Sequence, residues 1–69
     1  MTMELKPHQQ RVVAEWNELG ERLEKLWAFF NTDIYAGLPE VERIRLRHQA
    51  RFMDGYAAIL TERIADFGA

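Results

Sequence analysis

The spacing of apolar residues predicts that this 69-residue chain contains two long amphipathic helices. In the first half, apolar side chains recur at steps of 4, 3, 4, 3 and 4 residues, the heptad seam of a packed helix. The residues of this seam are Val12, Trp16, Leu19, Leu23, Leu26 and Phe30. The pattern predicts a helix over about residues 7–30, with Pro7 at its first position.

The segment NTDIYAGLPE, between the two halves, reads as an elbow. Thr32 is placed to cap a single helical turn over about residues 33–36, and Pro39 suits the first position of a new helix. Apolar positions beyond it predict a second long helix over about residues 39–66. No strand pattern is present, so the expected fold class is all-α: one helical domain over residues 1–69, an antiparallel helical hairpin with a short helical elbow.

The small size of the chain predicts self-association. Folding orders each residue at a cost of about 1.5 kcal/mol, which a chain this short hardly offsets by burial within itself. Disulfides are excluded because the chain has no cysteine, and two histidines are a poor metal set, so no cofactor or metal is expected. A helical homo-oligomer is therefore favoured.

Composition narrows the cellular setting. The net charge of −2 gives no long-range attraction to nucleic acid or to an anionic membrane. No apolar run approaches the roughly 20 residues of a membrane helix, and no signal peptide is visible. A cytoplasmic protein without a membrane partner is expected.

Two tryptophans and an arginine cluster each allow two interpretations. Trp16 and Trp27 stand eleven residues apart, nearly on one helix face, where they could sandwich a base. Packing in the core or in a subunit interface is the commoner role and is favoured. Arg43, Arg47 and Arg51 recur every four residues, either as a phosphate-binding stripe or, as we favour, as a solvated face. The solvated ion pairs expected on the first helix, at i,i+4 spacing, are Glu18 with Arg22 and Glu21 with Lys25.

The start of the first helix lacks the acidic residues that usually favour a helix N-terminus. The turn after Pro7 reads His8, Gln9, Gln10 and Arg11. Free backbone N–H groups at such a position can bind phosphate, and these side chains could add hydrogen bonds, stacking and charge. Lys25 lies too far along the helix to join them within one chain, but it would meet them if two copies of the helix packed antiparallel.

No enzyme signature accompanies these features. The chain lacks a cysteine nucleophile and a zinc-binding histidine pair, and its carboxylates are scattered among basic residues. A binding protein is expected rather than an enzyme.

The chain resembles the phage anti-CBASS cyclic-oligonucleotide sponges, from Leu5 to Phe67. The resemblance rests on the order of LKPHQQRVVAEWNELGERLEKLWAFF, the TDIYAGL elbow and the ending YAAILTERIADF. It implies a compact helical protomer that assembles into a hexamer. It also implies that cyclic nucleotides made by bacterial defence cyclases are sequestered without cleavage in the cytoplasm of the infected host, which inhibits CBASS immunity.

The resemblance also implies two kinds of ligand site. Cyclic dinucleotides of the cGAMP type would bind between protomers near the start of the first helix, and cyclic trinucleotides such as cyclic triadenylate would bind at a separate threefold site. The residues it implies are His8, Gln9, Gln10, Arg11 and Lys25 for the first site and Arg63 for the second. Polymeric nucleic acid is not an expected partner.

Another function remains open from the residues themselves. A helical hairpin of this kind could dimerise into a four-helix bundle and bind RNA or a protein partner. RNA binding would use the arginine stripe and depend steeply on salt. A protein-interaction module would use the tryptophan-rich face.

Overall fold

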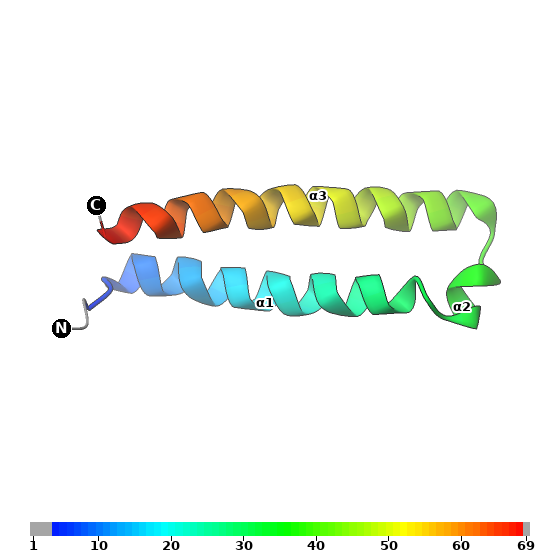
Figure 1. Cartoon of the computed structure of the whole chain (residues 1–69), viewed down its shortest axis with the longest axis horizontal. Helices are drawn as coiled ribbons and strands as arrows, with labels where there is room; N and C mark the ends of the chain where they lie inside the picture. The colour runs from blue at the N-terminus through cyan, green and yellow to red at the C-terminus, as the bar shows by residue number, and fades with distance from the viewer. Residues whose placement is uncertain (1–3, 69) are drawn as a thin grey trace.

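The computed structural model describes residues 4–68 as a hairpin of two long helices (Figure 1). Helix α1 covers Pro7–Phe29, the short helix α2 covers Asp33–Ala36, and helix α3 covers Glu40–Ala65. A 3₁₀ turn over Asp66–Gly68 follows α3. Helices α1 and α3 lie side by side and antiparallel, with α2 at the elbow end. The all-α prediction is confirmed, since residues 4–68 contain no strand.

The Thr32 hydroxyl forms hydrogen bonds with both helices that meet at the elbow, α1 and α2. It donates to the carbonyl oxygen of Phe29 at 2.7 Å, at the end of α1, and accepts the N–H of Tyr35 at 3.2 Å, at the start of α2. Each bond satisfies a backbone group that a helix terminus leaves without an intrahelical partner. The capping role predicted for Thr32 is confirmed.

Pro39 is not the first residue of the second long helix, as predicted, but precedes it. It is the N-cap of α3, with φ −54° and ψ 146°, and the helix begins at Glu40. The fixed φ of proline suits either position, and the extended ψ decides for the cap. Glu40 and Glu42 then lie in the first turn, where the partial positive charge of the helix start stabilises their carboxylates.

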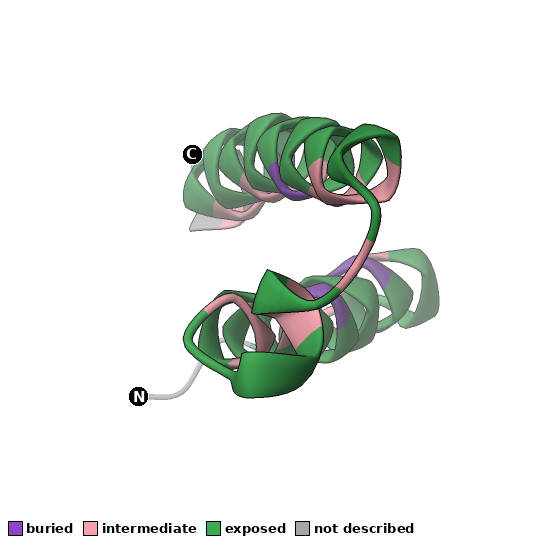
Figure 2. Ribbon diagram, turned by 90° about the vertical axis from the view of Figure 1, so that its right-hand side faces the viewer, coloured by how far each residue is buried: buried purple, intermediate pink, exposed green. Residues whose placement is uncertain are grey.

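The core of one protomer is small. Leu60 is completely buried and packs with Val12 and Leu19 across the two long helices. Partly buried side chains of Met53, Ala57, Ile64 and Phe67 surround this cluster. Ala50 is also buried, toward the elbow half of α3. Figure 2 shows how few buried positions line the facing sides of the helices, with most of both surfaces exposed.

The hairpin is a rod rather than a globule. Its extents are 51 × 16 × 15 Å, and its radius of gyration is 15.8 Å. A compact domain of the same length would have a radius of gyration of roughly 11 Å. Since two helices meet along one side only, each keeps a face that no other part of the protomer covers.

These uncovered faces carry large apolar side chains. Trp16 is 41% exposed and Trp27 51%, so packing of the tryptophans in the core of the protomer is wrong, while packing in a subunit interface stays a prediction. Exposed on α3 are Val41, Ile44, Phe52, Tyr56 and Ile59, and Ile34 is exposed on the elbow helix α2. Scattered apolar residues are normal on surfaces, but this many on so short a chain indicate an interaction surface.

Candidate functional site

The first turn of α1 carries four of the residues that the sequence singles out for ligand binding. His8, Gln10 and Arg11 are exposed, and Gln9 is half-buried. Both glutamine side chains already bind nearby backbone. Gln9 Oε1 accepts the N–H of Lys6 at 2.8 Å, and Gln10 Nε2 donates to the carbonyl oxygen of Leu5 at 2.9 Å. His8 and Arg11 are therefore the side chains most available to a ligand at this turn.

Two features of the hairpin partly compensate for the absence of acidic residues in the first turn of α1. No acidic residue lies in that turn, but Gln9 supplies a polar oxygen to the backbone just before the helix. The C-terminal end of α3 also lies at this end of the molecule, where Ile64 and Phe67 pack on the cluster containing Val12 (Figure 1). The partial negative charge of that helix end opposes the partial positive charge of the α1 start.

Arg63 belongs to the same end of the hairpin as the first turn of α1. It is exposed in the last turn of α3. Nearby, the Tyr56 hydroxyl donates a hydrogen bond to Glu15 Oε1, and this bond raises the pKa of Tyr56. The charge of Arg63 opposes that shift, so its guanidinium lies within electrostatic reach of the Tyr56–Glu15 pair. One protomer therefore presents cations from both helices at its terminal end.

Lys25 is not brought to that end. It follows Arg11 by fourteen residues on the same helix, which corresponds to roughly 21 Å along the axis. A ligand that contacts both Lys25 and the first turn of α1 must therefore bridge two protomers.

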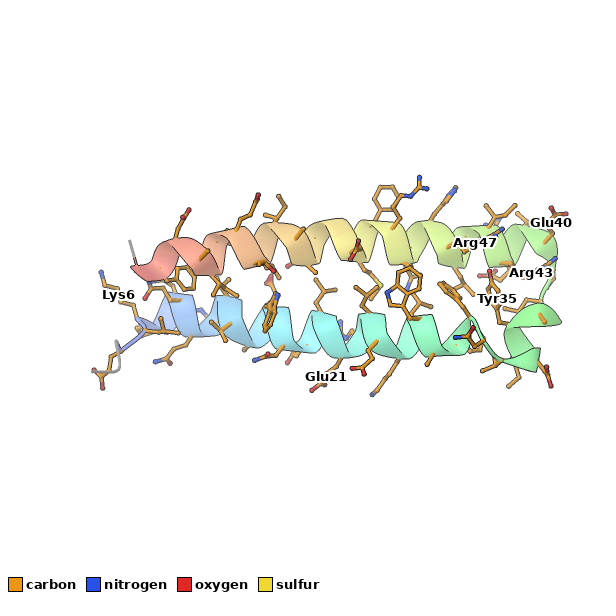
Figure 3. The ribbon with its side chains drawn as sticks, in the orientation of Figure 1. Lys6, Glu21, Tyr35, Glu40, Arg43 and Arg47 are labelled. Carbon is orange, nitrogen blue, oxygen red and sulfur yellow. The ribbon has the colours of Figure 1, made fainter. Side chains whose placement is uncertain are left out.

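The Lys25 ammonium has no carboxylate of residues 4–68 within 4.0 Å. Within residues 4–68, the only ion pair within 4.0 Å joins Arg45 to Glu42 at 3.8 Å. The predicted pairing of Glu21 with Lys25 is therefore wrong, as is that of Glu18 with Arg22. Figure 3 shows Glu21 pointing away from α3. Solvation of both partners offsets most of the gain from such exposed pairs.

The arginine stripe of α3 is interrupted at its elbow end. Arg43 is half-buried, and Tyr35 donates a hydrogen bond to its carbonyl oxygen at 3.4 Å, so both lie together at the elbow (Figure 3). The buried Arg43 Nε has no hydrogen-bond partner among the described residues. Arg47 and Arg51 remain exposed. A continuous three-arginine surface is therefore not formed.

A groove between α1 and α3 contains residues that sequence analysis did not combine. Trp27 and Phe30 line it from the end of α1, and Arg47, Arg51 and Asp54 line it from α3. Its volume is about 340 Å³. The signal that could have found it is the elbow, because an antiparallel return places residues near 27 opposite residues near 47. We call these five residues the Trp27 groove.

Aromatic contacts hold the Trp27 side of this groove. Trp27 and Phe30 meet edge to face, with ring centroids 5.6 Å apart and planes at 90°. Phe30 in turn packs on Tyr35 of the elbow at 4.9 Å. Such arrangements suit the quadrupoles of the rings and restrict how the indole can turn.

A shallower hollow lies along α3 itself. It has a volume of about 500 Å³, and most of its walls are apolar. The lining residues are Arg45, His48, Gln49, Phe52, Met53 and Tyr56. Phe52 is 76% exposed there, which makes this hollow a candidate contact surface for a second chain.

Residues 4–68 form neither a cluster of metal ligands nor a membrane-spanning helix. No group of three or more potential metal ligands lies together in this part of the chain. None of the described helices combines the length and apolar character needed to cross a membrane.

Comparison with known proteins places the chain in a family. No curated protein and no solved structure matches it significantly. The profile of the Sequestin family, however, matches residues 6–66, which include both long helices and the elbow. This match confirms the resemblance to the cyclic-oligonucleotide sponges, and its name denotes a protein that sequesters. The chain therefore belongs to the Sequestin family.

Proposed function

We propose that this protein binds cyclic di- or trinucleotide second messengers, holds them without cleaving them, and thereby inhibits CBASS immunity. It would act in the cytoplasm of the infected bacterium. The observation that carries the proposal is the family match over residues 6–66. A sequestering protein needs affinity and copy number rather than catalysis, and nanomolar affinity corresponds to about −12 kcal/mol.

Assembly is part of the proposed function. Four hydrophobic residues are buried in the described protomer, whereas eight large ones are exposed, and the chain has no cysteine to crosslink. A stable interface covers about 800 Å² on each partner, which is roughly one-seventh of the 5711 Å² surface of the protomer. The rod can therefore contact several neighbours at once, as a hexamer requires.

The cyclic dinucleotide would bind where two protomers meet. His8 and Arg11 are exposed at the start of α1, and Lys25 has no close carboxylate among the described residues, so all three can face an anion. The roughly 21 Å between Arg11 and Lys25 is consistent with their contributing from different chains. A two-fold interface would offer each half of the ligand the same cations.

The cyclic trinucleotide would use Arg63 from several protomers. This residue is exposed at the terminal end of the hairpin. A guanidinium binds a phosphate through two parallel hydrogen bonds, which suits a ring of repeated phosphates. Gln9 and Gln10 would contribute to the dinucleotide site only if their bonds to Lys6 and Leu5 were exchanged for ligand bonds.

The direct test is isothermal titration against 3′,3′-cGAMP and cyclic triadenylate, followed by chromatography of the recovered ligand. We expect tight binding and unchanged ligand. Lys25→Ala should weaken the dinucleotide, and Arg63→Ala should weaken the trinucleotide, each by about tenfold or more for a lost charge-assisted contact. Arg22→Ala is the matched control, since Arg22 is exposed on α1 and belongs to neither set.

Several outcomes would contradict the proposal. Absence of heat with both ligands would refute sequestration, and cleaved ligand on recovery would show an enzyme. Light scattering on the same samples should show an oligomer, and a monomer would exclude the shared sites. Strong, salt-sensitive binding of single-stranded RNA without cyclic-nucleotide binding would favour the RNA-binding hairpin instead.

A further inference from the structure

The Trp27 groove combines an aromatic ring, which can stack on a base, with guanidinium groups, which can bind a phosphate. None of its residues belongs to the sites proposed above. Trp27 is 51% exposed and is held edge to face by Phe30. Arg47 and Arg51 approach from the other helix, four residues apart and therefore on one face. We infer that this groove is a separate nucleotide site, which stacks a base on Trp27 and binds a phosphate ester with Arg47 and Arg51.

The guanidinium groups are available for such a ligand. Within residues 4–68, neither arginine has a carboxylate oxygen within 4.0 Å, although Asp54 lines the same groove. Both side chains are exposed, so they keep their hydration until a ligand arrives. A guanidinium is weakly hydrated for a cation and matches the oxygens of phosphate in a planar, two-bond geometry.

Size and charge select the class of ligand. At about 340 Å³ the groove lies near the lower end of the roughly 300–1,000 Å³ range of small-molecule sites, which suits one nucleotide unit. Asp54 adds a negative charge to the wall, so two arginines face one carboxylate. This balance suits a phosphate ester of low charge and disfavours a triphosphate. The ligand is therefore either a nucleoside monophosphate or one half of a cyclic dinucleotide.

The site lies apart from Arg63. Arg51 precedes Arg63 by twelve residues, which is roughly 18 Å along α3. Lys25, although close to Trp27 in sequence, is not among the residues that line the groove. Binding at the groove can therefore be measured independently of binding at the proposed sequestering sites.

The two tryptophans provide a direct measurement. In a Trp16→Phe variant, Trp27 is the only indole, and a stacked base should quench its fluorescence in a saturable way. In Trp27→Phe, the remaining Trp16 is tied to Thr61 at 3.0 Å outside the groove and should not respond to binding at the groove. The probes are AMP, 3′,3′-cGAMP, ATP and inorganic phosphate. Titration calorimetry of the unmodified protein gives the same affinities if Trp16→Phe folds poorly.

We expect AMP, cGAMP or both to quench Trp27, ATP to bind more weakly, and phosphate alone to compete without quenching. Quenching by AMP identifies a free mononucleotide as ligand, and quenching by cGAMP alone identifies the cyclic messenger. Trp27→Ala should weaken binding by about 5- to 150-fold, as loss of base stacking does. Arg47→Gln and Arg51→Gln should each weaken it about tenfold or more, whereas Arg22→Gln on the exposed face of α1 should not.

Three results would overturn the inference. One is the absence of saturable quenching by AMP and by cGAMP at millimolar concentration. Another is a blue shift of Trp27 emission as protein concentration rises, with no ligand response, since this would show that a second copy covers the groove. The third is loss of Trp27 quenching in both Lys25→Ala and Arg63→Ala, which would make the groove part of the sequestering sites. Failure at the groove with intact cyclic-nucleotide binding would leave the proposed function standing.

Discussion

Replacing Gly20 or Gly55 with alanine should stabilise the protein. Both glycines lie inside long helices, Gly20 in α1 and Gly55 in α3, and neither has a positive φ. Beyond the adjoining residues and the backbone of the same helix, a Cβ atom built on either one would meet no heavy atom of the described chain within 4 Å, so the substitution creates no clash there. Alanine then removes the extra backbone entropy that glycine loses on folding.

The expected gain is about 1 kcal/mol for each substitution, the difference between glycine and alanine in a helix interior. For a domain of 60–100 residues, 1 kcal/mol corresponds to a rise in Tm of about 4–8 °C. Thermal unfolding followed by circular dichroism at fixed protein concentration measures it. Gly37→Ala is the matched control, because Gly37 is the C-cap of α2 and an added Cβ would contact the carbonyl oxygen of Asp33 at 3.5 Å. Its Tm should change little.

A fall in Tm, or a smaller particle by light scattering, would refute this reasoning. It would mean that the space beside Gly20 or Gly55 is filled by another chain in the assembly. A glycine would then be needed for close approach between protomers. The two positions are informative separately, since they lie on different helices and can face different neighbours.

Three further substitutions test the packing and the hydrogen bonds of the hairpin. Leu60→Ala removes a completely buried leucine side chain from between the two long helices. It should destabilise the fold by about 2–5 kcal/mol, measured by denaturant unfolding, and a loss below 1 kcal/mol would mean that the site collapses freely. Thr32→Ala should cost about 0.5–2 kcal/mol in the same assay, because the N–H of Tyr35 loses its cap, and an unchanged midpoint would show that water replaces the hydroxyl fully. The hydrogen bond to Glu15 raises the pKa of Tyr56 above its ordinary value of 10.0. The stabilisation of the fold by this bond is therefore complete below pH 10.0 and is lost as the pH rises through the raised pKa. Tyr56→Phe should therefore flatten the alkaline fall in Tm, and an identical pH profile would contradict the coupling.

The helices and elbow were predictable because their signals are local. Apolar spacing marks each helix, and the hydroxyl of Thr32 caps where its position in the sequence indicates. The exposure of Trp16 and Trp27 was not predictable in the same way. A heptad pattern predicts that a side chain packs against a neighbour, but it does not indicate whether that neighbour belongs to the same chain.

The candidate sites depend on distances between side chains and on the register of α1 against α3. Neither can be read directly from the sequence. The first turn of α1 was recognisable, yet the local bonds of Gln9 and Gln10 follow from their rotamers. The meeting of Trp27 with Arg47 follows from where the elbow turns the chain back. One residue more in that elbow would rotate α3 and present a different side chain to the indole.

The placement of the chain ends has a practical consequence for labelling. The described chain begins and finishes at the same end of the rod, near His8 and Arg63 (Figure 1). A purification tag on either terminus would therefore stand beside cations proposed to bind ligand. The elbow lies at the far end of a 51 Å molecule, and Ile34 there is 70% exposed. Because the chain contains no cysteine, Ile34→Cys would give a unique attachment point for a dye or a surface anchor, away from the terminal cations.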